Sequence, residues 1–284
     1  MQVLRAILFM TASMACLALS DLFIKLSAQS LPPGQVMFFL SLGGTLLFML
    51  IAALRGIPLV SPAFWHPTVM SRNLAEVLAA LGMVTGIAWT PLPMVAAIMQ
   101  TTPLLVTLGA ALFLGEAVGW RRWAAIGVGF VGVIIILQPS GGVFSPYAAI
   151  PLLAALMFAL YALLTRYVAR GDSSATSFFY TGVSGVVVAT AIGAWFWVPM
   201  TGPDWAWMGL LCLTGAAGHY LMIRVYEVAE ASAVQPFAYL QLVFASTLGL
   251  VVFGETLRWN VVFGAAMIVA AGLFTLWRAR QKDT

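Results

Sequence analysis

Hydrophobic residues form long runs along this chain, and single charges, prolines and glycines separate the runs. Each run has about 20 residues, the length of an α-helix that crosses the roughly 30 Å of hydrocarbon in a bilayer. The connections between runs are short, so the pattern predicts an all-α integral membrane protein without an extramembrane domain. It places ten spanning helices at residues 3–27, 34–54, 70–90, 94–114, 120–138, 146–168, 174–198, 205–226, 231–253 and 258–278.

The positions of the basic residues predict the orientation of these helices. Lys and Arg concentrate at the cytoplasmic ends of membrane helices. If the amino terminus is cytoplasmic, only Lys25 and Arg258 of the 13 basic residues fall at the outer face. Losing or adding one helix would destroy this asymmetry. We therefore expect both the N and C termini to be cytoplasmic.

The composition excludes several classes of protein. Charged residues make up 8% of the chain, against about 25% in soluble domains. The basic residues are too scattered for a nucleic-acid surface, so we expect no nucleic-acid partner. Cys16 and Cys212 lie inside apolar runs and indicate neither a disulfide framework nor a thiolate metal site. No nucleotide-hydrolysis motif is visible. We expect no metal and no cofactor.

The chain contains an internal repeat. Residues 18–44 resemble residues 159–185 at an offset of 141, and Gly115-Glu116 recurs as Gly254-Glu255 at an offset of 139. The repeat predicts two five-helix halves, residues 1–140 and 141–284. Because five is an odd number, the second half enters the membrane inverted. Inverted repeats are typical of transporters that open a central site to each face in turn.

Several motifs carry a resemblance to a known family. They are Pro103 before Gly115-Glu116, Gly218-His219-Tyr220, the run from Pro236 to Leu240, and Gly254-Glu255. With these motifs the chain resembles the EamA family of the drug/metabolite transporter superfamily over essentially its full length. The resemblance implies a bacterial inner-membrane secondary transporter with ten transmembrane helices, two EamA-like halves and a central cavity. It leaves the substrate open, and the bacterial amino-acid exporters are one branch of the family.

Pairs of opposite charges occur within two of the predicted helices. Lys25 follows Asp21 by four residues, a spacing that predicts an intrahelical ion pair near the outer face. A role in gating or coupling is the alternative. Glu76 follows Arg72 at the same spacing, which predicts a local pair near the inner face, with a proton carrier as the alternative. For Glu116 and Glu255 the family resemblance suggests a shared structural role at a helix end.

Polar and aromatic residues near mid-depth are the candidates for the transport site. In hydrocarbon their polar groups need partners or a water-filled cavity, and hydrogen bonds between helices are the alternative explanation. Tyr239 and Gln241 project from different faces of one helix. The candidate substrate-binding residues are Trp89, Gln100, Thr101, Tyr161, His219, Tyr220, Tyr239 and Gln241, and the candidate gating or hinge residues are Asp21, Lys25, Pro103 and Pro236.

These features predict a secondary active transporter that exports small amphipathic metabolites across the inner membrane by alternating access, with amino acids as the first candidates. Amides, hydroxyls and aromatic rings near mid-depth suit a neutral or zwitterionic amphipathic solute, aromatic amino acids above all. A multidrug, lipophilic-cation or cofactor transporter of the same family is the alternative. We expect a monomer whose partners are a small-molecule substrate and the lipid bilayer. The alternative hypothesis from another functional class is an intramembrane serine protease that uses Ser184 and His219. It requires a hydrogen bond between these two side chains. We expect no enzyme.

Overall fold

Helices make up all the regular secondary structure in the described part of the chain. The computed structural model describes residues 2–56, 65–113, 119–137, 146–168, 174–193, 196–228 and 234–280. The α-helices are α1 (Gln2–Ser27), α2 (Pro33–Arg55), α3 (Pro67–Trp89), α4 (Leu92–Met99), α5 (Thr102–Phe113), α6 (Trp120–Leu137), α7 (Ala149–Val168), α8 (Ser174–Gly193), α9 (Gly202–Val228), α11 (Leu240–Phe253) and α12 (Trp259–Arg280). Two 3₁₀ segments, η2 (Pro146–Ala148) and η3 (Gln235–Tyr239), precede α7 and α11.

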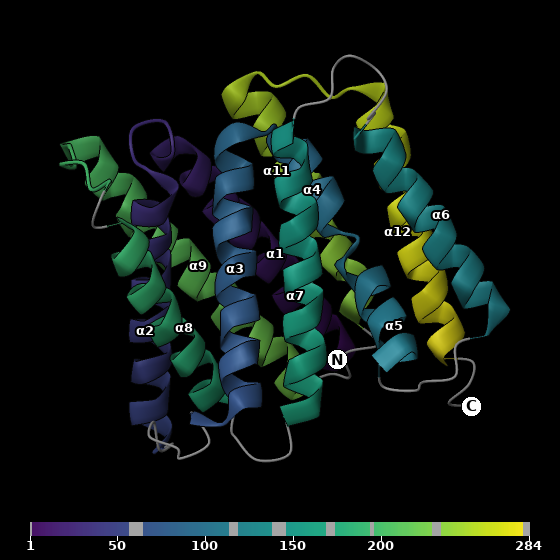
Figure 1. The fold of residues 1–284 in the computed structure, drawn as a ribbon, viewed down its shortest axis with the longest axis horizontal. Helices are drawn as coiled ribbons and strands as arrows, with labels where there is room; N and C mark the ends of the chain where they lie inside the picture. Colours follow the sequence, from purple (N-terminus) through teal and green to yellow (C-terminus); the bar gives the residue numbers. More distant parts are fainter. Residues whose placement is uncertain are drawn as a thin grey trace.

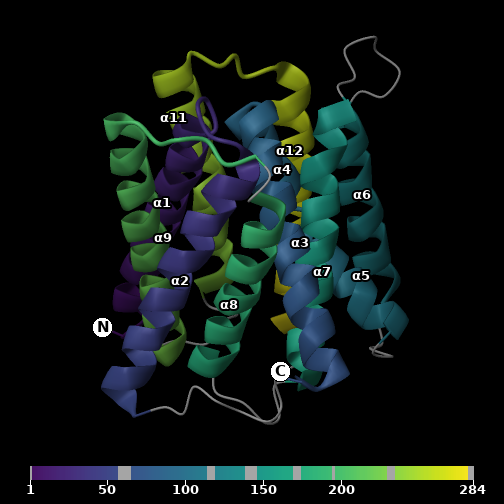
Figure 2. The same ribbon diagram turned by 60° about the vertical axis from the view of Figure 1, so that its left-hand side comes forward.

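The helices run side by side as one bundle (Figure 1). In that view α1 begins and α12 ends at the lower end, whereas the connection from α11 to α12 crosses the upper end. The main packing partners are distant in sequence: α1 packs against α9, α2 against α8, α3 against α7, and α6 against α12. The turned view in Figure 2 shows the same neighbours, with α1 and α9 at one side and α6 at the other. The short helix α4 meets α11.

Small residues allow the paired helices to approach closely. A Cβ atom added to Gly132 of α6 would lie 2.7 Å from the carbonyl oxygen of Gly264 on α12. Between α1 and α9, Ser13 Oγ donates a 2.7 Å hydrogen bond to the Gly218 carbonyl. Close backbone approach through small side chains, with hydroxyls bonded across the contact, is how helices associate in lipid.

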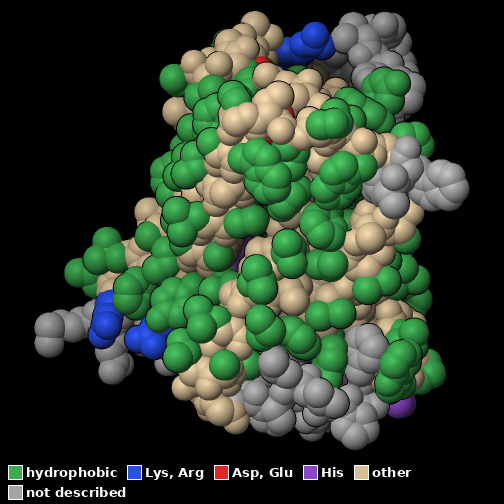
Figure 3. Space-filling view, turned by 90° about the vertical axis from the view of Figure 1, so that its left-hand side faces the viewer, with side chains coloured by type: hydrophobic (Ala, Val, Ile, Leu, Met, Phe, Trp, Pro, Cys, Tyr) green, Lys and Arg blue, Asp and Glu red, His purple; other side chains and the backbone are tan. Residues whose placement is uncertain are grey.

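The exterior of the bundle suits a bilayer. Large apolar side chains are exposed on it, including Leu54, Phe113 and Val251 at 77%, 81% and 77%. Figure 3 shows hydrophobic side chains across the middle of one face, with Lys and Arg toward the upper and lower parts. Such a surface is far too apolar for a water-soluble monomer. Six described segments are long and apolar enough to cross a membrane: Leu4–Ser27, Pro33–Arg55, Leu92–Phe113, Trp120–Leu137, Pro236–Phe253 and Trp259–Arg278.

Two of the predicted helices are interrupted. The predicted helix at 94–114 is divided into α4 and α5, and the predicted helix at 231–253 contains η3 before α11. The predicted helix at 174–198 ends earlier, at Gly193. Val198 lies outside any helix, and the Gln35 side chain bonds its backbone N–H and carbonyl at 3.1 and 3.0 Å.

Candidate functional site

A tight turn after α11 places Glu255 over the start of another helix. Gly254 ends α11 with φ +61°, the left-handed conformation that favours glycine at helix ends. The chain reverses there, and the Glu255 N–H donates to the Gly249 carbonyl at 3.1 Å. Glu255 Oε2 then accepts a 2.9 Å hydrogen bond from the N–H of Leu92, the first residue of α4. Free N–H groups and the helix dipole make such a position favourable for a carboxylate.

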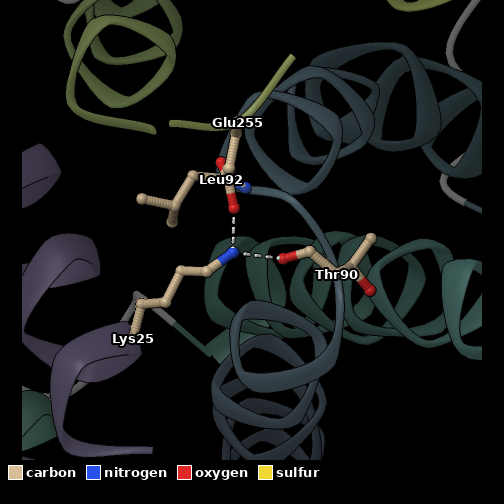
Figure 4. Close-up of polar contacts among 4 residues, drawn as sticks. All are labelled: Lys25, Thr90, Leu92 and Glu255. Atoms are coloured by element: carbon tan, nitrogen blue, oxygen red, sulfur yellow. Dashed lines mark hydrogen bonds and ion pairs between the residues drawn. The ribbon is translucent and has the colours of Figure 1, made fainter. Parts of the chain in front are cut away.

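Lys25 of α1 meets the same carboxylate (Figure 4). Its Nζ forms an ion pair with Glu255 Oε1 and donates a 2.9 Å hydrogen bond to the Thr90 carbonyl. The two charged side chains are only 14% and 12% exposed. The contact ties α1, the connection from α3 to α4, and the segment after α11 together at one end of the bundle. We call Lys25, Thr90, Leu92 and Glu255 the outer lock, because the sequence predicts that this end of the bundle lies at the outer face.

The expected ion pair between Asp21 and Lys25 is therefore wrong. Lys25 turns instead to a residue 230 positions away. Asp21, 6% exposed, accepts a 3.0 Å hydrogen bond from Gln241 Nε2 near the start of α11. Both side chains on this face of α1 thus bind to the α11 region, which links the two candidate gating residues to one neighbouring element.

The interruptions in the helices lie where the polar candidates are. Gln100 caps α4, and the buried Thr101 donates from Oγ1 to the Ile98 carbonyl at 2.7 Å. Pro103 and Pro236 are the second residues of α5 and η3, so each proline starts a segment instead of kinking its interior. The internal repeat has an offset of about 140 residues, so the break at Gln100 corresponds to the junction between η3 and α11. Discontinuous helices at matching positions of a repeat are typical of transporter binding sites.

Tyr239 and Gln241 face different helices. Gln241 turns to Asp21 on α1. The Tyr239 side chain is buried at 8% exposure, and its hydroxyl lies directly against Gly272 of α12. That hydroxyl has no hydrogen-bond partner within the described residues. The two therefore do not line one surface, although both flank the same interruption.

The other aromatic and imidazole candidates are spread over the bundle. Trp89 is the last residue of α3, 56% exposed, and its ring lies 5.1 Å from that of Tyr147 at the rim. Tyr220 is 41% exposed on the same face of α9 as the exposed Leu213, not on the Gly218 face that packs against α1. The structure thus brings neither Trp89 nor Tyr220 to the interior with Gln241.

His219 and Tyr161 lie within the bundle but make local contacts. The Nδ1 atom of His219 lies 2.8 Å from the Gly215 carbonyl, one turn back on α9. The Tyr161 ring on α7 packs 5.7 Å from the ring of Phe158. Ser184 of α8 donates to the Tyr180 carbonyl at 2.8 Å. Within the described residues no hydrogen bond joins Ser184 to His219, so the structure does not assemble the serine-protease arrangement.

The burial of Arg72 on α3 and its hydrogen bonds to Asn73 were not predicted from the sequence. Arg72 is only 2% exposed, and its Nε and Nη2 atoms donate to Asn73 Oδ1 at 3.2 and 2.8 Å. The spacing of Arg72 and Glu76 signalled a local pair near the inner face, but nothing in the sequence singled out Asn73. The arginine is shielded among packed helices rather than placed at a solvated rim.

A pocket of about 260 Å³ adjoins the outer lock. Glu255 lines it, together with Thr90, Trp89, Arg258 and Asn260. The Thr90 Oγ1 atom is buried without a hydrogen-bond partner in the described residues. Within those residues no group of three or more His, Cys, Asp or Glu side chains is placed to hold a metal ion.

An apolar bundle with interrupted helices, locked at one end by an ion pair between distant segments, defines a polytopic membrane protein of the transporter class. The EamA-like transporter family matches residues 4–138 and 146–277. The chain belongs to this family, within the drug/metabolite transporter superfamily. It is a multi-pass protein of the bacterial inner membrane and a transporter rather than an enzyme.

The relatives found carry different cargoes. A riboflavin transporter from Rhizobium johnstonii is 35% identical over 218 residues, covering 75% of this chain and 72% of the relative. An S-adenosylmethionine uptake transporter from Rickettsia bellii is 28% identical, covering 74% and 75%. The pseudopaline exporter CntI from Pseudomonas aeruginosa is 26% identical, covering 87% of each chain. A solved structure described only as a crystal structure of a protein has the same fold, with a TM-score of 0.65, 19% identity and coverage of 98% and 99%.

Proposed function

We propose that the chain works by alternating access, with ten membrane crossings in two inverted halves and cytoplasmic termini. The observation that carries this proposal is the outer lock, which joins Lys25, Thr90 and Leu92 of the first half to Glu255 of the second. It lies at the end of the bundle where α1 ends and α12 begins. In this conformation the outer end is closed, and transport requires the lock to open.

The packing of the helices supports the inverted arrangement. Exchanging the two halves would carry the contact of α1 with α9 onto that of α7 with α3, and both contacts are extensive. The contact of α1 with α11 would likewise become that of α7 with α5, which is also present. The pairs α2 with α8 and α6 with α12 would map onto themselves. This correspondence is what two related halves of opposite orientation produce.

The orientation is tested by labelling single cysteines in a protein whose Cys16 and Cys212 have been replaced by serine. Thr256→Cys, after α11, should react with an impermeant maleimide added outside cells. Gly119→Cys, before α6, should react only after the inner face is made accessible. Five crossings separate the two positions. Reversed access at both would reject the orientation, and access from one face at both would reject the helix count.

For the substrate we propose a neutral or zwitterionic amphipathic metabolite, with a riboflavin-like solute first. The riboflavin transporter is 35% identical to this chain over three quarters of its length. The side chains at the helix interruptions are amides and hydroxyls, which bind uncharged polar groups. Aromatic amino acids share this chemistry and are the second candidate. S-adenosylmethionine, which other relatives take up, is the third candidate.

Counterflow in proteoliposomes tests the substrate. We expect labelled riboflavin to exchange with internal riboflavin, and Gln241→Ala to slow this exchange about ten-fold, because leaving one partner of a buried hydrogen bond unsatisfied costs about 1 to 3 kcal/mol. Thr247→Ala is the matched control, since the Thr247 hydroxyl is exposed and bonds only Val243 of its own helix at 2.8 Å. Exchange of tryptophan or S-adenosylmethionine without exchange of riboflavin would reject the assignment.

A further inference from the structure

Asp21 is a buried carboxyl group that binds no cation among the described residues. It is 6% exposed and lies six residues before the end of α1, about 9 Å along the helix. Within the described residues, its polar contact is the 3.0 Å hydrogen bond from Gln241. Lys25, one turn further along the same helix, is engaged by Glu255 and by the Thr90 carbonyl. The nearest basic side chain in the sequence is therefore committed elsewhere.

The other elements packed against α1 offer Asp21 no ion pair. Within the described residues, no Lys, Arg or His nitrogen lies within 4.0 Å of its carboxyl oxygens. His219 on α9 is turned to the Gly215 carbonyl, and Arg72 on α3 bonds Asn73. The helix α11 carries no titratable residue. Among the side chains that the structure describes, the remaining titratable groups of these neighbours are Asp204, Cys212, Tyr220 and Arg224 on α9, Glu76 on α3, Tyr239 on η3, and Glu255 after α11.

We expect such a carboxyl group to carry a proton in this conformation. An uncompensated charge within the hydrocarbon region costs about 2.5 to 3.5 kcal/mol even on the scales that give the lowest values. A single hydrogen bond from an amide offsets only part of this cost. Protonation removes the charge and still leaves a carbonyl oxygen that accepts from Gln241.

We propose that Lys25 exchanges partners during transport, binding Glu255 when the outer end is closed and Asp21 when it is open. Opening the outer lock leaves the ammonium group without its carboxylate. Asp21 lies four residues earlier on the same helix, within reach of the flexible lysine side chain. When Lys25 turns to it, the proton on the Asp21 carboxyl leaves to water on the open face. Lys25 stays protonated throughout, so one proton is released for each opening.

This exchange couples a proton to the movement of the gate, and it rests on the proposed alternating-access function. Glu255 does not need to move, because the Leu92 N–H and the turn at Gly254 hold it at the start of α4. The lysine side chain is the mobile part. Asp21 and Glu255 thus share the ammonium group of Lys25. Asp21 takes up a proton when Lys25 leaves it, whereas Glu255 remains bonded to the start of α4 when Lys25 leaves it.

The test uses the full chain in lipid nanodiscs without any substrate. Infrared spectra record the carbonyl stretch of protonated carboxyl groups, and the difference between the parent protein and Asp21→Asn isolates the band of Asp21. We expect this band to be present at pH 7 in the parent. In Glu255→Gln, Lys25 is freed to bind Asp21, and the ratio of protonated to ionised carboxyl should fall about ten-fold or more. The double variant Lys25→Gln with Glu255→Gln should restore the band.

Further variants separate the exchange from a general structural effect. Lys25→Gln alone should keep the band, because no cation remains to displace the proton. Asp204→Asn, the same substitution at a carboxyl group bonded by Ser30 and Thr201 at the start of α9, should leave it unchanged. An Asp21 band that is absent from the parent, or equal in the parent and Glu255→Gln, would overturn the proposal. Since no substrate is used, failure of riboflavin exchange would count against the proposed substrate and not against this mechanism.

Discussion

Reversing the charge at position 25, with Lys25→Glu, should slow riboflavin counterflow about 30-fold or more. The substitution places a second carboxylate beside Glu255, so the outer end cannot close and the cycle stalls. Breaking a buried ion pair costs about 3 to 5 kcal/mol. The 14% and 12% exposure of these side chains reduces that cost, and about 2 kcal/mol remains, which is a factor of about 30. Initial rates in proteoliposomes, normalised to inserted protein, measure the effect.

The exchanged double variant Lys25→Glu with Glu255→Lys serves as the control. It restores opposite charges, but a lysine at position 255 cannot accept the Leu92 N–H and places a cation at the positive end of α4. We therefore expect partial recovery, and the missing part measures the contribution of the helix end. A parent-like rate in Lys25→Glu alone would show that the outer lock has no part in transport.

Gly249→Ala should also disrupt the outer lock, although it changes no charge. A Cβ atom at this position would lie 2.5 Å from Glu255 Oε2 and 2.9 Å from Pro93 Cδ, so Glu255 and α4 would have to move. Overpacking of this kind costs about 1 to 3 kcal/mol. We expect the counterflow rate to fall about ten-fold, together with a lower midpoint in thermal unfolding of the purified protein.

Gly209→Ala provides the comparison on α9. A Cβ atom there meets nothing within 4 Å in the described structure. Alanine is also the better helix former by about 1 kcal/mol, so this variant should transport normally and unfold at the same or a higher temperature. If Gly249→Ala behaves like Gly209→Ala, the close approach of α11 to α4 is not required for the lock.

The spans of the helices followed from the sequence because hydropathy measures what lipid requires. The apolar runs place α1, α2, α6 and α12 within a few residues of their ends in the structure. The interruptions at Gln100 and before Leu240 were not located, because hydropathy does not report backbone hydrogen bonds. Pro103 and Pro236 signalled irregularity nearby, but each begins a helical segment instead of bending one.

The spacing of charged residues along one helix did not predict the contacts between distant segments. The four-residue spacing of Asp21 and Lys25 predicts a pair on one helix, whereas the geometry at the end of α11 makes Glu255 the stronger partner. A signal did exist, since the predicted topology placed both Lys25 and Glu255 at the outer face. The repeat also pairs Glu255 with Glu116, which lies outside the described residues.

The lock also restricts which cation can serve at position 25. Glu255 offers only Oε1, because the backbone of α4 occupies Oε2, and the second acceptor is the Thr90 carbonyl. An ammonium group can direct its hydrogens to two acceptors that lie apart, whereas a guanidinium group makes its strongest contacts with both oxygens of one carboxylate. Arginine at position 25 would preserve the charge, but it would not match the positions of these two acceptors. Shape, as much as electrostatics, therefore specifies lysine at this point of the chain.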